Sequence, residues 1–205
     1  IIFEIFVYTN FAGLSLLIYG IFGILGYKIP LNFKQPFSSS NIIDFWKGWH
    51  TSLSAILKVL FYRPVRKRYS TFYAILIVYI ASAFWHGVTI NFLIWGIFHA
   101  LMFWLTIKAL NNNFKILPII LLFIGVVIGR LIFADNNTER LLEKLTFSYE
   151  GTSKLIPLLD LPSTTIMSLI LAITLIAIEF FFKKNKFVRK RNYKHLRTPF
   201  ALFII

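Results

Sequence analysis

The sequence predicts an all-α protein, a polytopic membrane helix bundle with a re-entrant or interfacial amphipathic helix that carries a histidine. Composition is the first observation behind this fold class. Of the 205 residues, 58% are hydrophobic and only 15% are charged, and the mean hydropathy is +0.72. These values lie outside the range of ordinary soluble domains. We expect one membrane-embedded domain over residues 1–205, as the carboxyl-side part of a longer chain, because the sequence begins with Ile and ends in an apolar run.

The second observation is that apolar stretches recur at about the length of a bilayer-spanning helix, roughly 20 residues. Five spans are expected, at residues 5–25, 72–90, 92–107, 116–133 and 164–182, and a sixth would begin at 199–205. The glycines along the first stretch are expected to be positions of close helix packing: they are Gly13, Gly20, Gly23 and Gly26.

The third observation is the uneven distribution of charge in a chain with a formal net charge of +14. Eight basic residues lie between 28 and 68 and eight more between 183 and 197, whereas 135–160 holds five acids and three bases. Because Lys and Arg are enriched in cytoplasmic loops, we expect the two basic segments inside and 134–163 outside. The basic runs are therefore interpreted as orientation signals that contact anionic lipid heads, and nucleic acid is not an expected partner.

Several chemistries are excluded by residue usage. The chain contains no cysteine, so it has no disulfide, no thiolate nucleophile and no zinc-thiolate site. It also lacks a Gly-rich phosphate loop and an HExxH motif. The reactive groups that remain are mainly histidines and hydroxyl groups.

The first histidine lies in the motif FWKGWHTSLS, residues 45–54. Two prolines and three serines precede it, and Asn41 with Asp44 can cap a helix that begins there. From Asn41 to about residue 61, apolar residues fall on one face and polar residues on another, with His50 at the border. We expect one re-entrant or interfacial helix over 41–62. A surface helix without catalytic function is the alternative.

Two further histidines lie in predicted spans, in a helical hairpin over residues 72–110. His86 is in SAFWHG, one turn after Ser82, and His99 follows Trp95 by four residues in IWGIFHA. Ionisable groups within a membrane are costly and usually functional. Together with His50 they suggest a polar site in a helix bundle. A metal site of these histidines and Asp44 has suitable ligand types but lacks a short metal-ligand spacing, so no metal is expected.

These motifs, taken together and in this order, resemble the membrane-bound O-acyltransferase family. The similar blocks are YTNFAGLS, PLNFKQPFSSSNIIDFW, FWKGWHTSLS, SAFWHG and IWGIFHA, which run from about residue 8 to 110. The resemblance is strongest to the bacterial branch, which includes alginate O-acetyltransferases and the D-alanyl transfer protein of teichoic acid modification. Family members are longer and have more spans before the first block.

The resemblance implies that His86 is the catalytic residue and that His50 is a second active-site group. An imidazole with a pKa near about 6.5 can take the proton of an alcohol that attacks a thioester, and His50 can orient the donor or polarise its carbonyl. Tryptophans near the motifs would exclude water. The full set predicted to contact substrate is Trp46, Trp49, Ser52, Trp85, Asn91 and His99.

The favoured function is transfer of an acyl group, most simply acetyl, from a cytoplasmic thioester to a hydroxyl of a cell-surface or exported polysaccharide. Acyl-CoA or an acyl carrier protein would serve as donor substrate, with no bound cofactor. The expected location is the inner (plasma) membrane, and the expected partners are membrane lipids, donor, glycan acceptor and an extracytoplasmic accessory acetyltransferase. The alternatives are D-alanyl transfer toward teichoic acid and a transporter or structural membrane component. Among the acidic residues, only Glu179, near the end of the fifth predicted span, and Glu4, at the start of the first, lie in or directly beside a predicted span, which disfavours a proton-coupled transporter.

Overall fold

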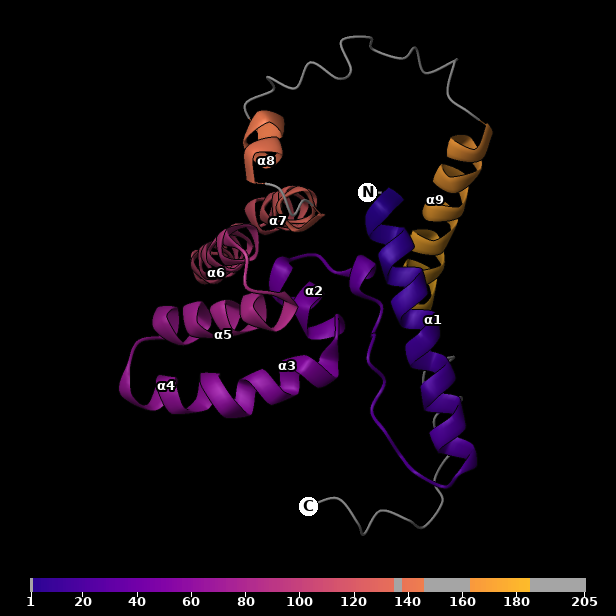
Figure 1. The fold of residues 1–205 in the computed structure, drawn as a ribbon, viewed down its shortest axis with the longest axis horizontal. Helices are drawn as coiled ribbons and strands as arrows, with labels where there is room; N and C mark the ends of the chain where they lie inside the picture. Colours follow the sequence, from indigo (N-terminus) through magenta and orange to yellow (C-terminus); the bar gives the residue numbers. More distant parts are fainter. Residues whose placement is uncertain (1, 135–137, 146–162, 185–205) are drawn as a thin grey trace. The chain divides into compact units, whose positions relative to one another are not determined.

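A computed structural model describes residues 2–134, 138–145 and 163–184. All regular structure in these residues is helical (Figure 1), which confirms the all-α class and agrees with a membrane helix bundle. The chain forms two compact units. Unit 1 consists of Ile1–Ser39, Asp44–Ser52 and Pro162–Ile205, and unit 2 of Ser40–Ile43 and Leu53–Leu161.

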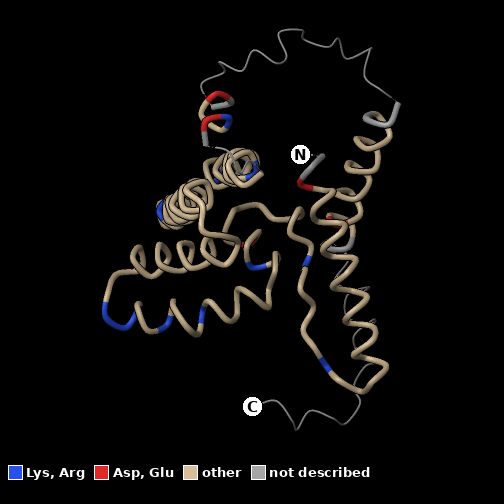
Figure 2. The backbone as a smooth tube through the Cα atoms, viewed as in Figure 1, with Lys and Arg blue, Asp and Glu red and all other residues tan. Residues whose placement is uncertain are grey.

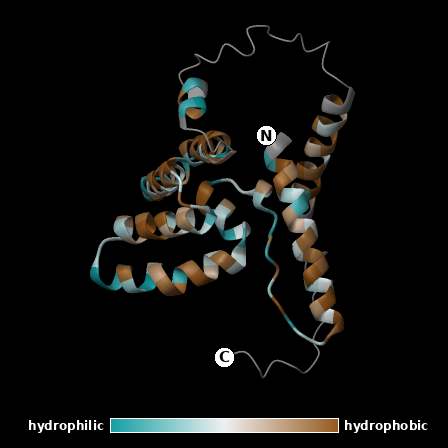
Figure 3. Cartoon of the chain, in the orientation of Figure 1, coloured by the Kyte–Doolittle hydropathy of each residue, from teal (hydrophilic) through white to brown (hydrophobic). Residues whose placement is uncertain are grey.

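The five predicted spans coincide with the five longest described helices. These are α1 (Ile2–Ile24), α5 (Thr71–His86), α6 (Ile90–Asn111), α7 (Leu117–Ala134) and α9 (Ser163–Lys184). Three of them, α1, α6 and α7, are long and apolar enough to cross a membrane, and Figure 3 shows the hydrophobic residues along α1 in brown. Helix α5 and the apolar part of α9, Ile166–Phe181, are shorter than a typical span. The predicted sixth span lies outside the described residues.

In unit 1, α9 packs against α1 and against the short 3-10 helix η1 (Pro36–Ser38). A buried carboxylate links these three elements. The hydroxyl of Tyr8 in α1 donates to Glu179 Oε1 in α9, and the backbone N–H of Phe37 donates to Glu179 Oε2 at 2.9 Å. An ionised carboxylate is acceptor-only, so Glu179 satisfies donors from two separate segments.

In unit 2, α5, α6 and α7 pack through glycines. A Cβ atom on Gly96 would lie 2.7 Å from the backbone oxygen of Tyr79, so α6 approaches the α5 backbone closely. Cβ atoms on Gly125 and Gly129 of α7 would lie 2.4 Å from Ile42 Cδ1 and 2.2 Å from His99 Cε1. Absence of a side chain at these sites permits close helix contact.

The glycines of the first predicted span were expected to be positions of close helix packing, but the described residues do not show this contact. Nothing among the described residues lies within 4 Å of a Cβ placed on Gly13, Gly20, Gly23 or Gly26. The close-packing role therefore belongs to glycines of α6 and α7. A glycine on an apolar helix signals a contact only where another helix runs beside it.

The single helix expected over 41–62 is wrong. The segment forms α2 (Ile42–Gly48), α3 (Thr51–Leu57) and a π-helical turn, η2 (Lys58–Tyr62), which continues into α4 (Arg63–Arg68). The start directly after Asn41 agrees with the prediction, but the chain breaks at Trp49 and His50. His50 has φ 46°, in the left-handed region that residues other than glycine seldom adopt.

The physical reason for the break is that a distant segment satisfies the backbone groups that would pair across it. Gly48 O accepts from Lys34 N at 2.8 Å, and Thr51 N donates to Asn32 O at 2.9 Å. Ser52 N donates to Asn32 Oδ1 at 3.2 Å. Buried backbone groups need partners but not helical ones, so the extended segment 32–34 replaces one turn of helix.

Charged residues gather at two places in unit 2 (Figure 2). Helix α4 carries Arg66, Lys67 and Arg68 in its last turn, where positive charge is favourable next to the carbonyl end of a helix. Helix α8 (Thr138–Leu145) belongs to the segment predicted to lie outside the membrane and carries Glu139 in its first turn. The sidedness of the basic and acidic segments stays a prediction.

Candidate active site

His86 is the last residue of α5 and is exposed. The helix stops there because Gly87, which follows, has φ 154°. A Cβ at Gly87 would lie 2.9 Å from Cε2 of Phe92, so both backbone conformation and space require glycine. The motif WHG therefore places an imidazole at a helix end, where a reactant can approach it.

Three aromatic rings surround the His86 imidazole. Its centroid lies 4.8 Å from Phe133 of α7 at an interplanar angle of 84°, 5.7 Å from Trp95 and 6.0 Å from Phe92 of α6. Edge-to-face contacts of this kind restrict how a ring is oriented. The imidazole is thus held by rings of α6 and α7 although its own helix ends at it.

His99 lies in the same unit but is buried, with 2% of its surface exposed. Its Nδ1 is 3.0 Å from the backbone oxygen of Trp95, and a carbonyl oxygen only accepts, so Nδ1 carries the proton. The ring stacks on Tyr79 and lies 4.6 Å from the Trp95 ring, and Gly129 leaves room for it. Trp95 therefore contacts both histidines of unit 2.

His50 lies in unit 1, in the break between α2 and α3, and is half-buried. Its Nδ1 is 3.2 Å from Asn32 Oδ1 and 3.4 Å from Ser52 Oγ, and Ser52 Oγ donates to Asn32 Oδ1 at 2.9 Å. The edge-to-face ring of Phe11 is 4.7 Å away. Burial lowers the pKa of His50 below its usual value, which favours the neutral imidazole at physiological pH.

The other predicted site residues divide between the units. In unit 1, Ser52 contacts His50, and buried Trp49 packs against Phe45 and Phe33. The half-buried Trp46 contacts the Phe45 ring.

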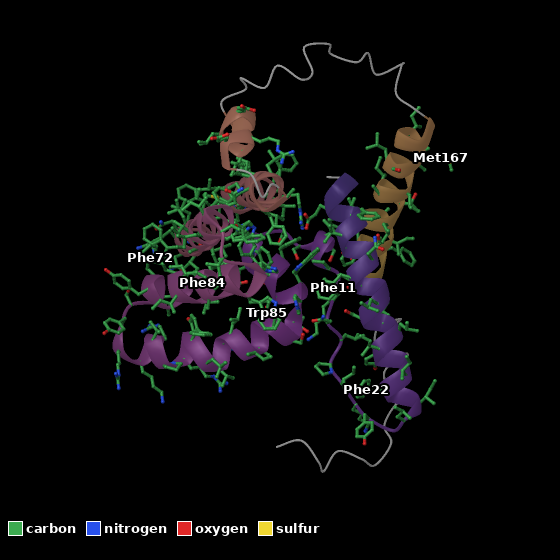
Figure 4. All side chains as sticks on the ribbon, in the orientation of Figure 1. Phe11, Phe22, Phe72, Phe84, Trp85 and Met167 are labelled. Carbon is green, nitrogen blue, oxygen red and sulfur yellow. The ribbon has the colours of Figure 1, made fainter. Side chains whose placement is uncertain are left out.

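In unit 2, Asn91 is buried in the first turn of α6, and Trp85 is 67% exposed (Figure 4). Water exclusion by Trp46, Trp49 and Trp85 therefore stays a prediction, as do the substrate contacts of the whole set.

Two neighbours of the histidines were missed by the sequence interpretation. Asn32 is 18 residues before His50 and Phe133 is 47 residues after His86, so no periodic pattern relates them to the histidines. Asn32 does lie within the block PLNFKQPF, and its polar side chain between apolar neighbours is a usable signal.

Metal binding is not indicated by the described part of the chain. In residues 2–134, 138–145 and 163–184, no three His, Cys, Asp or Glu side chains are grouped so as to hold a metal ion. What unit 2 offers instead is an accessible imidazole fixed by aromatic rings. That arrangement is suited to proton transfer.

Comparison with known proteins identifies the family. The profile of the membrane-bound O-acyltransferase family matches residues 1–117, which include all three described histidines. The chain is 33% identical over 140 residues to the probable alginate O-acetylase AlgI of Pseudomonas syringae pv. tomato, covering 63% of this chain and 27% of the relative. It is 35% identical over 98 residues to the peptidoglycan O-acetyltransferase of Helicobacter pylori, covering 46% and 19%.

A third relative is named for a different activity. The teichoic acid D-alanyltransferase of Bacillus subtilis is 29% identical over 129 residues, covering 57% of this chain and 33% of the relative. The chain thus matches between about a fifth and a third of the length of these three proteins.

Proposed function

Because the chain belongs to the membrane-bound O-acyltransferase family, we propose that it transfers an acyl group, most simply acetyl, to a hydroxyl of a cell-surface or exported polysaccharide. The observation that carries this proposal is the family match across residues 1–117, which contains the three histidine motifs. The relatives named for alginate and peptidoglycan O-acetylation favour a polysaccharide acceptor.

In this proposal His86 is the general base. Its imidazole takes the proton of the acceptor hydroxyl as the oxygen attacks the thioester carbonyl, an ester C–O bond forms and the C–S bond breaks. The proton then passes from the imidazolium to the leaving thiolate. Exposure of His86 at the end of α5 supports this role, because a base must come within hydrogen-bonding distance of the proton that it removes.

We assign His50 to the binding of the acyl donor. A neutral imidazole can accept a hydrogen bond from a group of the acyl donor through its unprotonated nitrogen, and burial keeps His50 neutral over more of the pH range. The donor would be an acyl thioester, acyl-CoA or acyl carrier protein, used as a substrate and without a bound cofactor. His99, buried and bonded to the α6 backbone, would support the site rather than react.

The cellular setting follows from the same proposal. The chain would act in the inner (plasma) membrane as a multi-pass protein, with its basic segments on the cytoplasmic side. Its partners would be membrane lipids, the donor, the glycan acceptor and an accessory acetyltransferase on the outer side. Nucleic acid is not among them.

D-alanyl transfer toward teichoic acid is the second candidate, and the similarity to the Bacillus subtilis enzyme favours it. Both reactions attack an activated acyl carbonyl with a hydroxyl, so the same base would serve both. They differ in the group that is transferred, which is chemically easy to distinguish. A transporter or structural component would transfer neither group.

The test is His86→Ala in the full-length protein. The ester released from the cell envelope by mild base should fall by about 100-fold or more, because a general base commonly contributes that much. Chromatography of the released acid identifies acetate or D-alanine, and an immunoblot normalises for membrane level. His195→Ala is the control, since His195 lies in a basic tail outside the described residues and has no expected role. Wild-type ester content in the His86→Ala strain would return the non-enzymatic alternative to first place.

A further inference from the structure

We propose that Asn32 is a positioning residue for His50, which it holds in the tautomer that carries the proton on Nδ1 and leaves Nε2 as the basic nitrogen. The use of this tautomer in acyl transfer rests on the proposed function. The tautomer itself does not, because it follows from hydrogen-bond geometry within unit 1.

The orientation of the Asn32 amide is decided by a backbone group. Ser52 N–H lies 3.2 Å from the Oδ1 position of Asn32, and a backbone N–H can only donate. The Asn32 atom that faces it must therefore be the oxygen. The amide nitrogen lies on the other side, 3.3 Å from Ser15 Oγ, which can accept. Donor chemistry thus excludes the flipped amide.

The same oxygen determines which nitrogen of His50 is protonated. Asn32 Oδ1 has lone pairs and no hydrogen, and it is 3.2 Å from His50 Nδ1, so Nδ1–H is the donor. A neutral imidazole carries one N–H, which leaves Nε2 unprotonated. Burial lowers the pKa of His50, which keeps the ring in this neutral form.

A competing arrangement, in which Ser52 donates to Nδ1, is disfavoured by the distances. Ser52 Oγ is 3.4 Å from His50 Nδ1 but only 2.9 Å from Asn32 Oδ1. A hydroxyl has one hydrogen, and the shorter contact takes it. Asn32 Oδ1 is therefore within hydrogen-bonding distance of three donors, His50 Nδ1–H and the N–H and O–H groups of Ser52, which share its two lone pairs.

The backbone around Asn32 is held without its side chain. Its carbonyl accepts from Thr51 N at 2.9 Å, and Thr51 Oγ1 donates to Leu31 O at 2.6 Å. Lys34 N donates to Gly48 O at 2.8 Å, and a Cβ at Gly48 would lie 2.8 Å from Lys34 O. Substitution of the Asn32 side chain consequently leaves these backbone contacts available. The amide group contacts the His50 ring, Ser52 and Ser15.

The experiment reads the tautomer directly. Full-length protein with ring-¹⁵N histidine is placed in lipid nanodiscs, and two-bond ¹H–¹⁵N correlations are recorded near pH 8, with His50 assigned from its loss in His50→Gln. We expect the Nδ1–H pattern in the wild type, although free histidine in water favours Nε2–H. Asn32→Leu, which has a similar size and no acceptor, should shift His50 to Nε2–H. Ser52→Ala, the matched control, removes one donor but retains Nδ1–H.

Asn32→Asp is a second test of the contact between residue 32 and the His50 ring, because it keeps the accepting oxygen. It should retain Nδ1–H and move the titration midpoint of His50 to higher pH, because a carboxylate beside the ring favours the imidazolium. An Nε2–H wild type, an unchanged pattern in folded Asn32→Leu or an unchanged midpoint in Asn32→Asp would each overturn the proposal. If Asn32→Leu does not fold, the wild-type pattern and the Asn32→Asp midpoint still decide the question.

Ester content in the same strains separates this inference from the proposed function. Transfer should fall in Asn32→Leu, by less than in His50→Ala, and recover in Asn32→Asp relative to Asn32→Leu. A tautomer that responds as expected while ester content stays at the wild-type level in His50→Ala would sustain the role of Asn32 and reject the role of His50 in transfer.

Discussion

Around His50 the nearest groups are an amide, a hydroxyl and one aromatic ring, whereas His86 and His99 are surrounded by aromatic rings from three helices. The His50 region is built from an extended segment and a broken helix. The unit 2 region is built from α5, α6 and α7, which are regular to their ends.

The difference teaches how the same side chain is controlled in two ways. Hydrogen bonds select a protonation state, as at His50, because they discriminate between a nitrogen that donates and one that accepts. Aromatic contacts fix the position of a ring but are less selective about its proton. In unit 2, the accessible imidazole of His86 and the buried imidazole of His99 both contact the Trp95 ring.

The largest expected effect separates the two histidines of unit 2. His99→Ala should lower the free energy of unfolding by about 3 kcal/mol, because it removes a buried ring and its hydrogen bond to Trp95. His86→Ala should change it by less than about 0.5 kcal/mol, since His86 is exposed. Unfolding by SDS in mixed micelles, followed by circular dichroism, measures both. Equal losses in the two variants would contradict the difference in burial between His99 and His86.

A second prediction tests the buried position of the His99 ring through Gly129 of α7, which lies against it. Gly129→Ala should cost about 2 kcal/mol by overpacking against the His99 ring, which the Trp95 carbonyl holds in place. Gly125→Ala is the matched control on the same helix: its Cβ meets the end of the flexible Ile42 side chain, so its cost should be smaller. In a double-mutant cycle, His99→Ala should remove most of the Gly129→Ala penalty. Additive losses would contradict the contact.

Glu179 tests whether the His50 unit depends on helix α9, which lies beyond the matched residues 1–117. Glu179→Ala leaves Tyr8 OH and Phe37 N–H without this acceptor and should cost about 2 kcal/mol. Glu179→Gln keeps one accepting oxygen and should cost less. Glu139→Gln is the control, because Glu139 is exposed on α8, with a change below about 0.5 kcal/mol. Thermal unfolding in detergent measures these losses of stability. A Glu179→Ala variant as stable as Glu139→Gln would show that Glu179 does not stabilise unit 1.

The smallest effect is the pH dependence that His50 contributes to stability. Its pKa is lowered in the folded state, so the unfolded chain binds more protons between that pKa and about 6.5. The free energy of unfolding should therefore rise with pH across this window and level off above about pH 6.5. Unfolding of wild type and His50→Gln from pH 5 to 8 isolates the contribution. Parallel curves for the two proteins would show that burial does not affect the ring.

Much of the architecture was predictable from sequence because it depends on local properties. Apolar runs of the right length become the helices α1, α5, α6, α7 and α9 with ends shifted by a few residues. The ordered histidine motifs were enough to indicate the family. Each of these depends on hydrophobicity, length or turn chemistry within a short window.

Only the tertiary structure decided what depends on segments distant in sequence. The pattern over 41–62 satisfies helical periodicity throughout, yet the chain breaks at His50 because segment 32–34 supplies partners for the backbone groups on either side. Likewise, Tyr8 and Glu179 are separated by 171 residues, and Gly129 matters because His99 of another helix lies against it. Local propensity describes one segment at a time, whereas hydrogen-bond satisfaction and close packing are decided between segments.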